Sequence, residues 1–218
     1  MTVFSLQQAL GIELPSIDIL DVGARMEGED RYQDLRKMGL ARVTGFEPDQ
    51  RSFQELMANK AESDNYLPYF LGTGQPQSFN LTRYPGCSSL YEPNPAVIDL
   101  FTSLSTQEEG NFKVLETLEV ETKRLDDISE CPAPDFMKLD VQGAEYDILK
   151  HATRALESVL VIESEVEFIA LYQDQPLFGD LQVYLRDQGL VLHKFIDIAG
   201  RSFKPFGRGN NPHAATSQ

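Results

Sequence analysis

Basic residues, cysteines and long apolar runs are all scarce in this chain of 218 residues. Its 19 Lys and Arg stand against 34 Asp and Glu, which gives a formal net charge of -15 at pH 7. This charge argues against a large phosphate-binding surface, because nucleic-acid affinity depends on clustered Lys and Arg that release counterions. The same repulsion disfavours an anionic membrane surface. We therefore expect neither DNA nor RNA as a partner.

The scarcity of apolar runs and cysteines bears on location. No stretch approaches the roughly 20 uninterrupted apolar residues that a membrane helix needs. Residues 1–8 contain neither a basic leader nor a continuous apolar segment, so they do not resemble a secretory signal. Cys87 and Cys131 are too few and too far apart for a disulfide framework or a zinc cluster, and we expect structural thiols. These absences predict a cytoplasmic protein without a membrane span.

Length and apolar content limit the number of domains. A chain of 218 residues that is 41% apolar suits one large domain with a single core. No internal repeat or inter-domain linker is visible. After residue 206 the sequence offers no further apolar strand. We therefore predict one domain over residues 1–206, and over 207–218 a flexible tail or a truncated end.

Short apolar runs alternate with helical patterns along the chain. This order is typical of strand-helix-strand crossovers, and it predicts an α/β fold with a mostly parallel, twisted sheet and helices on both faces. Strands are expected at residues 17–22, 41–46, 66–71, 113–122, 135–140, 158–163 and 190–198, with a further possible strand at 77–81.

Helices are expected between these strands. Their ranges are 31–38, a helix beginning at residue 49 or 50, 97–104 and 177–187. Residues that should share the buried side of a helix are Tyr32, Leu35 and Met38, then Phe53, Leu56 and Met57, and finally Leu181, Tyr184 and Leu185. The stretch 72–95 is rich in Gly, Pro, Ser and Asn, which predicts an irregular excursion above the sheet. Such excursions are often functional.

A possible ligand loop follows the first strand, at Asp21-Val-Gly-Ala. Gly23 allows the backbone to turn tightly and approach a ligand. In nucleotide reductases such a turn holds a pyrophosphate, for which the carboxylate of Asp21 is a poor neighbour. S-adenosylmethionine suits Asp21 better, because it carries an ammonium and a sulfonium and no phosphate. The incomplete glycine fingerprint further disfavours a nicotinamide cofactor.

A second acidic position ends the second strand, at Gly45-Phe-Glu-Pro-Asp49. Glu47 is placed to accept hydrogen bonds from two ribose hydroxyls, the role that an acid has in NAD sites. Asp49 has two interpretations of equal weight, a contact with the sugar and an ordinary helix N-cap. Together the two acidic positions predict an adenosine-bearing cofactor.

Three segments together resemble the FkbM-type family of S-adenosylmethionine-dependent methyltransferases, namely Asp21-Val-Gly-Ala, Gly45-Phe-Glu-Pro and Lys138-Leu-Asp-Val-Gln-Gly-Ala-Glu145. The similarity spans about residues 17–198. It implies a class I methyltransferase (Rossmann-like) fold with a seven-stranded sheet, and methyl transfer to a hydroxyl oxygen of a sugar or small natural product. It also implies cofactor contacts from the loop residues Asp21, Gly23 and Ala24, from Glu47 at the ribose, and from Gly72 near the adenine. Pro48 and Asp49, next to Glu47, are further candidates for cofactor binding.

The resemblance extends to the acceptor side of the site. Gly86-Cys-Ser-Ser-Leu90 matches a Ser-rich stretch common in the family, which implies that Ser88 and Ser89 lie over the methyl-transfer site, although a simple loop turn is the alternative. Arg25, Met26 and Glu27 intervene before Gly28, so the first loop is longer or differently bent than is usual in the family.

Methyl transfer to an alcohol needs a base for the hydroxyl proton. Asp140 is the first candidate, because it ends a central strand where open parallel sheets place ligand chemistry. An equally weighted alternative is that Asp140 holds the amino group of the cofactor. Glu163, followed by Glu165, ends the next strand and is expected beside Asp140, where it could orient a polyol or carry a proton. Glu145 is interpreted as a helix cap, and Lys138 as a positioning residue that needs a carboxylate partner.

Two functional hypotheses follow. The first is an S-adenosylmethionine-dependent O-methyltransferase acting on a carbohydrate or small natural product. The second is a noncatalytic domain that keeps the cofactor fold and has lost turnover. Since the acidic residues show no fixed ligand spacing, no metal site is predicted.

Overall fold

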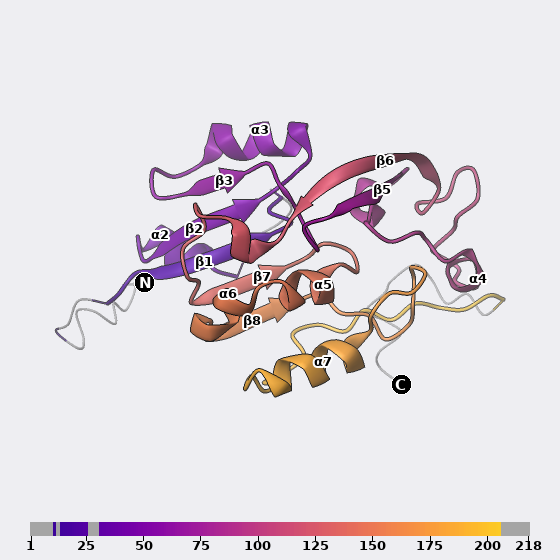
Figure 1. Cartoon of the computed structure of the whole chain (residues 1–218). Helices are drawn as coiled ribbons and strands as arrows, with labels where there is room; N and C mark the ends of the chain where they lie inside the picture. The colour runs from indigo at the N-terminus through magenta and orange to yellow at the C-terminus, as the bar shows by residue number, and fades with distance from the viewer. Residues whose placement is uncertain (1–10, 12–13, 26–30, 206–218) are drawn as a thin grey trace, which may run out of the picture.

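A parallel sheet forms the centre of the molecule, which is described here by a computed structural model covering residues 11, 14–25 and 31–205. Five strands in the order β3-β2-β1-β7-β8 make up this sheet within the described residues (Figure 1). Their bounds are β1 Ile17–Val22, β2 Ala41–Phe46, β3 Asn65–Leu67, β7 Phe136–Leu139 and β8 Val161–Ser164. All four neighbouring pairs are parallel, as the alternation of strands and helices predicts.

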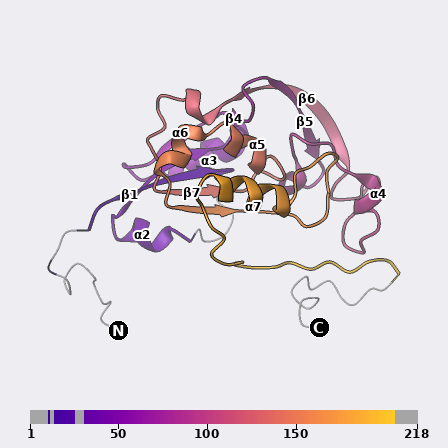
Figure 2. The same ribbon diagram turned by 60° about the horizontal axis from the view of Figure 1, so that its bottom comes forward.

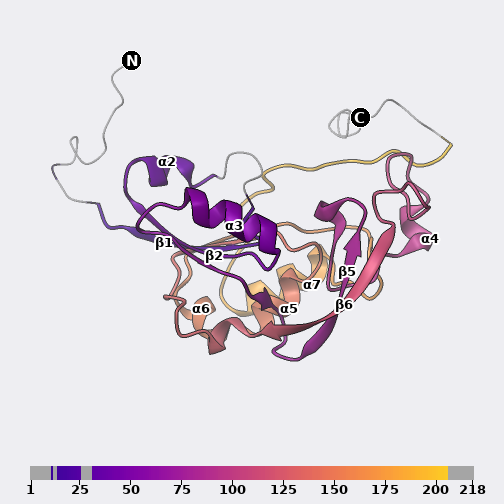
Figure 3. The same ribbon diagram turned by 90° about the horizontal axis from the view of Figure 1, so that it is seen from above.

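Helices cover both faces of the sheet (Figure 3). Successive residues of a strand point to opposite faces of the sheet. On one face Ile19 and Val43 pack with Leu56 beneath α2 (Gln33–Lys37) and α3 (Gln50–Asn59). On the other face Leu20 and Met137 pack against the helices α5 (Glu145–Lys150), α6 (Thr153–Ser158) and α7 (Phe178–Asp187). The mixed α/β fold class predicted from the sequence is confirmed.

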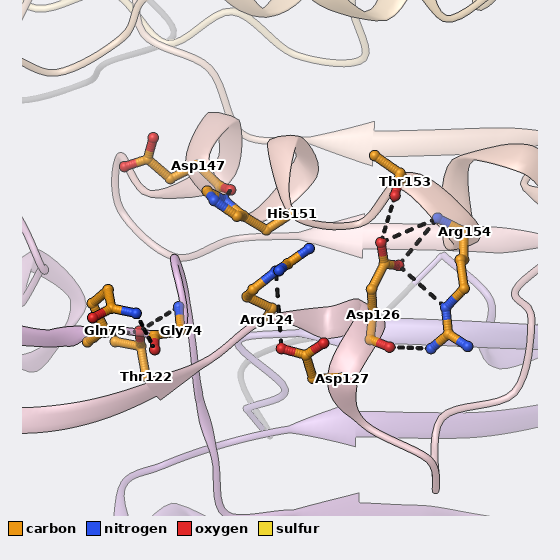
Figure 4. A network of polar contacts seen from close by, with 10 residues as sticks. All are labelled: Gly74, Gln75, Thr122, Arg124, Asp126, Asp127, Asp147, His151, Thr153 and Arg154. Carbon is orange, nitrogen blue, oxygen red and sulfur yellow. Dashed lines mark hydrogen bonds and ion pairs between the residues drawn. The ribbon is translucent and has the colours of Figure 1, made fainter.

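A smaller sheet in the order β4-β6-β5 projects from the main one (Figure 1). Its strands are β4 Phe70–Leu71, β5 Pro76–Thr82 and β6 Val114–Lys123, and β5 and β6 form a long antiparallel ribbon. Thr122 fastens the base of the ribbon, since its Oγ1 donates to the Gln75 carbonyl at 2.7 Å and accepts from the Gly74 N–H at 3.1 Å (Figure 4). The excursion predicted at residues 72–95 contains this ribbon's first strand, the 3-10 helix η1 (Pro85–Cys87) and the start of α4 (Pro95–Ile98).

The chain returns to the main sheet through the 3-10 helix η2 (Leu125–Asp127). Asp126 of η2 accepts hydrogen bonds from the hydroxyl of Thr153 at 2.6 Å and from the N–H of Arg154 at 3.1 Å (Figure 4). It therefore supplies a side-chain acceptor to the first turn of α6, where backbone N–H groups have no partner within the helix. This contact ties the end of the ribbon to the helical layer.

Two predicted elements differ from the observed secondary structure. The expected strand 66–71 is divided into β3 and β4, which belong to different sheets, because Pro68 has no N–H to continue a ladder. The expected helix 97–104 ends at Ile98, and the following residues form single turns. Ile98, Phe101 and Leu104 are nevertheless buried together. Their spacing in the sequence therefore predicted which residues are buried, but not the conformation of the backbone.

The expected strand 190–198 is also wrong. These residues all belong to the described chain and form no strand, and Val191 is 84% exposed. A strand needs a neighbour to complete its hydrogen bonds, and the sequence pattern does not show whether one is present. The segment instead runs as an extended strap outside the sheet (Figure 2). Farther along the chain Phe203 stacks on Phe101, which follows α4. The central sheet accordingly has five described strands where the family resemblance implied seven.

Smaller corrections concern helix faces and one strand boundary. Met38 and Met57 are 57% and 41% exposed, so neither belongs to the buried side of its helix. Leu181, Tyr184 and Leu185 do pack into the core as predicted. Ser158 ends α6, and the strand expected at 158–163 begins only at Val161. The tail predicted over 207–218 lies outside the described residues.

Candidate active site

A crevice opens at the carboxyl edge of the central sheet, where parallel α/β folds bind their ligands. Its walls come from the ends of β1, β2 and β7 and from the excursion that carries η1. The lining residues are Val22, Gly23, Arg25, Phe46, Glu47, Pro48, Tyr69, Phe70, Leu71, Phe79, Tyr84, Pro85, Gly86, Ser88, Leu90, Lys138, Asp140, Val141, Gln142 and Ala144. The crevice thus collects most of the sequence-predicted segments in one place.

Gly23 lies where the ends of three strands converge. Its φ is +83°, and a Cβ at this position would lie 2.1 Å from the carbonyl oxygen of Asp140. The N–H groups of Gly23 and Ala24 both donate to the carbonyl of Phe46 at 3.0 Å, and the N–H of Asp140 donates to that of Val22 at 3.0 Å. The glycine is therefore required by the close approach of β1 and β7. Ala24 is buried in the core next to it, and the cofactor contacts of both residues stay predictions.

Asp21 is buried against Lys138. Its side chain is 2% exposed, and Lys138 Nζ lies 3.0 Å from Asp21 Oδ1. The hydroxyl of Tyr32 donates to Asp21 Oδ2 at 2.5 Å. The expectation that Lys138 needs a carboxylate partner is met here. The charge of Asp21 is balanced within the protein, so its part in binding a cationic cofactor stays a prediction.

Glu47 is a buried acid on the crevice wall, with 2% of its surface exposed. Arg25 Nε donates to Glu47 Oε2 at 3.2 Å, and the N–H of Asp49 donates to Oε1 at 2.8 Å. Burial raises the pKa of Glu47, while these two donors oppose the shift. Pro48 lines the same wall. Glu47 is therefore held with its carboxylate at the end of β2, as the sequence predicts.

Asp49 begins α3 as its N-cap. Its Oδ1 accepts hydrogen bonds from the N–H of Ser52 at 2.9 Å and from the hydroxyl of Ser52 at 2.8 Å. Although burial opposes it, this hydrogen bonding lowers the pKa of Asp49. The capping interpretation of Asp49 is confirmed, and its contact with a sugar stays a prediction.

Asp140 meets Glu165 across Gln142. Gln142 Nε2 donates to Asp140 Oδ1 at 3.0 Å and to Glu165 Oε2 at 2.5 Å. Burial, the charge of Asp140 and a hydrogen bond between the two carboxyl groups raise the pKa of Glu165 to about 9. The protonated form of Glu165 is therefore favoured at neutral pH.

Glu163 lies elsewhere. In β8 it is the register partner of Lys138, on the sheet face that α2 and α3 cover, and Arg31 Nε donates to its Oε1 at 3.0 Å. The structure therefore brings Glu165, two residues farther on, to Asp140, and does not bring Glu163 there. A catalytic role for Glu163 stays a prediction. The signal for Glu165 was its position just beyond β8, where the chain leaves the sheet and the strict alternation of a strand no longer fixes the side.

Glu145 stabilises the turn that carries Asp140. The side chain is buried, and its two oxygens accept the N–H groups of Val141 and Gly143, each at 2.9 Å. Gln142 and Gly143 have φ values of +58° and +103°, which places this turn in the left-handed region. Burial and the charge of Glu167 raise the pKa of Glu145 to about 8. Its carboxyl group thus holds the turn before α5, a structural role close to the predicted cap.

Ser88 and Ser89 link the excursion to this turn. The hydroxyl of Ser89 donates to the carbonyl of Gln142 at 2.6 Å. Ser88 lines the crevice, and its Oγ accepts the N–H of Thr82 at 3.1 Å. Ser89 therefore contacts the turn that follows Asp140, and Ser88 lines the same crevice. The place of both serines over a methyl-transfer site stays a prediction.

Aromatic residues at the foot of the ribbon form another wall of the crevice. Phe70 and Phe79 pack with ring centroids 4.9 Å apart, and both line the crevice with Tyr69. Gly72 lies just behind this wall, where its N–H donates to the carbonyl of Lys123 at 3.0 Å. The place of Gly72 near an adenine stays a prediction. Sequence reasoning missed the aromatic wall, because residues 69–79 come to the crevice only through the second sheet.

A profile described as the methyltransferase FkbM domain matches residues 21–192. The chain belongs to the FkbM methyltransferase family. The matched region begins at Asp21 and includes the whole crevice. The family predicted from three short motifs is confirmed, and the FkbM assignment does not favour the noncatalytic alternative.

One curated relative of this FkbM domain is the hexuronic acid methyltransferase AglP of Haloferax volcanii, which is 30% identical over 159 residues. The alignment covers 70% of this chain and 61% of the relative, so the chain spans about 61% of the length of that protein. No solved structure matches the chain significantly.

Two further points concern metal ligands and membrane-spanning helices in the described residues. Within them, no group of three or more His, Cys, Asp or Glu side chains has an arrangement that could hold a metal ion. No helix among the same residues of this FkbM domain has the length and apolar content that crossing a membrane requires.

Proposed function

We propose that this FkbM methyltransferase uses S-adenosylmethionine to methylate a hydroxyl oxygen of a carbohydrate. The observation that carries the proposal is that two acids, Glu47 and Asp140, line one crevice from the ends of different strands. Glu47 is deeply buried and suited to fixed hydrogen bonds. Asp140 adjoins Glu165, a carboxyl group whose protonated form is favoured.

The residues of the crevice fit this cofactor. Each oxygen of Glu47 accepts one hydrogen bond within the protein, and a carboxylate offers about four acceptor sites, so ribose hydroxyls would find free lone pairs there. Tyr69, Phe70 and Leu71 give an apolar wall on the same side for the adenine. The Lys138 ammonium would meet the methionine carboxylate, while Asp21 keeps it in place.

The remaining cofactor contacts are proposed from the family resemblance and from neighbouring positions in the sequence. Gly23 and Ala24 would pass beneath the methionine end, Pro48 and Asp49 would border the ribose, and Gly72 would lie behind the adenine. The bound cofactor would supply a methyl group made electrophilic by its sulfonium. The task left to the protein is then to orient a hydroxyl oxygen and accept its proton.

Asp140 is proposed as the proton acceptor. Gln142 fixes one of its oxygens, and Asp140 lines the crevice from the end of the central strand β7. Ser88 would hydrogen-bond a neighbouring hydroxyl. The Haloferax volcanii relative, a hexuronic acid methyltransferase, supports a sugar or sugar acid as the acceptor.

Calorimetry followed by a transfer assay tests the proposal. S-adenosylmethionine and its demethylated product should both bind the full chain, and labelled methyl groups should pass to members of a panel of monosaccharides and hexuronic acids. If neither cofactor form binds, the cofactor assignment fails. Binding without transfer to any acceptor, including small natural products with hydroxyl groups, would instead support the noncatalytic domain.

A further inference from the structure

Tyr84 presents an exposed aromatic ring at the crevice. The residue is 57% exposed, and it lines the crevice together with Pro85, Gly86 and Ser88. An aromatic side chain left open to water forgoes the stabilisation that burial would give. An exposed aromatic residue in a crevice is therefore a candidate contact for a ligand.

The backbone of Tyr84 is held firmly although its ring is open. Its N–H donates to the carbonyl of Asn111 at 3.1 Å. Its own carbonyl accepts the hydroxyl of Thr82 and the N–H of Cys87, both at 2.8 Å. The ring also lies against Gly86, where a Cβ would come within 2.8 Å of Tyr84 Cε1. Binding of a ligand to this ring would therefore cost little free energy for ordering the loop.

The ring belongs to the same part of the crevice as Asp140. Ser88 and Ser89 follow Tyr84 closely, and Ser89 is bonded to Gln142, whose amide contacts Asp140. The chain just before the apolar wall of Tyr69 to Leu71 is bonded to Glu47 instead, since the N–H of Glu47 donates to the carbonyl of Leu67 at 3.1 Å. The contacts therefore divide the crevice into a Glu47 side and an Asp140 side, and Tyr84 is tied to the second.

We infer that the ring of Tyr84 is a stacking surface for the pyranose ring of the acceptor. This inference rests on the proposed function and adds the residue that selects a cyclic sugar. The C–H bonds on one face of a pyranose carry partial positive charge and suit the negative face of an aromatic ring. The hydroxyls at its rim would then meet Ser88, Gln142 and Asp140, which are all polar and line the crevice.

The absence of Trp from the sequence allows a direct binding test. Tyr84→Trp places one fluorophore at the site, and a methyl pyranoside or hexuronate added to the protein saturated with the demethylated cofactor should change its emission in a saturable way. An acyclic polyol with as many hydroxyls should not. Leu160→Trp is the matched control, since Leu160 is 73% exposed and precedes β8 at the opposite edge of the sheet. Its emission should stay constant.

Kinetics supply a second measurement. Tyr84→Ala should raise the KM for a pyranoside acceptor by roughly two- to tenfold, the range of an aromatic stacking contact, with the Kd of S-adenosylmethionine unchanged. Tyr84→Phe should keep the KM near the wild-type value. Because the side chain is exposed, circular dichroism and thermal melting should show that both variants are folded.

The outcomes separate this inference from the proposed function. If pyranosides change the emission of Tyr84→Trp but no acceptor is methylated, the proposed function fails and the stacking surface stands. If methyl transfer occurs but the emission is silent and Tyr84→Ala keeps its KM, the inference is overturned. It is also overturned if the cofactor product alone causes the change, or if only amines and not neutral sugars do.

Discussion

Lys138 and Asp21 face each other on neighbouring parallel strands, and the ammonium nitrogen lies 3.0 Å from the carboxylate oxygen. Lys138→Met should lower the free energy of unfolding by roughly 3 kcal/mol, because it leaves the buried carboxylate of Asp21 without its ammonium partner. Urea denaturation measures the loss. The double variant Asp21→Asn/Lys138→Met should recover much of it. Additive losses in the two single variants would contradict the coupling.

Glu165 makes stability depend on pH. Its pKa rises from 4.5 to about 9 on folding, so the folded state favours the protonated form. This contribution is fully present below pH 4.5 and is lost as the pH rises toward about 9. The free energy of unfolding, measured by denaturation across this window, should therefore fall with pH. Glu165→Gln should flatten the fall, leaving the parts due to Glu145, Glu47 and Glu167, whose pKa values are also raised by burial. An unchanged slope in the variant would show that Glu165 is not the titrating group.

Glu47 and Asp140 should differ in what they contribute. Glu47→Ala should raise the Kd of S-adenosylmethionine by roughly ten- to a hundredfold, since it removes hydrogen bonds to a charged acceptor. Asp140→Asn should instead lower kcat by roughly a hundred- to ten-thousandfold and leave the Kd nearly unchanged. Calorimetry and the transfer assay separate the two effects. Equal loss of affinity in both variants would assign Asp140 to cofactor binding.

Gly23 offers a test of backbone packing with a matched control. Gly23 and Gly39 have similar φ values, +83° and +71°, but a Cβ at Gly39 would have no atom within 4 Å. Gly39→Ala should cost about 1–2 kcal/mol for its left-handed backbone alone. Gly23→Ala should cost at least about 2 kcal/mol more, because its Cβ would collide with the carbonyl of Asp140. Similar midpoints of urea denaturation for the two variants would refute the close approach.

The sequence predicted those parts of the fold that depend on local pattern. The strands β1 and β2 appear at the expected residues, because each is a short stretch in which apolar and β-branched residues predominate between turn residues. The expected strand 190–198 has the same composition without a neighbouring strand. Periodicity describes side chains along one segment, whereas a strand also needs hydrogen bonds from another.

The candidate site was predictable where a residue stands at a strand end. Glu47 and Asp140 follow β2 and β7 directly, so the edge of the sheet brings both to the crevice. Lys138 was correctly expected to need a carboxylate, although the sequence did not show that Asp21 provides it. Glu163 was placed wrongly beside Asp140, since the strand register directs it toward Arg31. Contacts of this kind depend on register and on the path of loops, which the sequence pattern leaves open.

The hydrogen bond from Ser89 to the carbonyl of Gln142 joins the loop of Tyr84 to the turn of Asp140. A shift of either segment would therefore be transmitted to the other, and the spacing between the stacking ring and the carboxylate is built in before any ligand arrives. Exchanging residues 84–89 with those of another member of the family should impair the protein unless residues 140–145 are exchanged with them. In this fold, a change of acceptor preference would therefore require changes in both segments together.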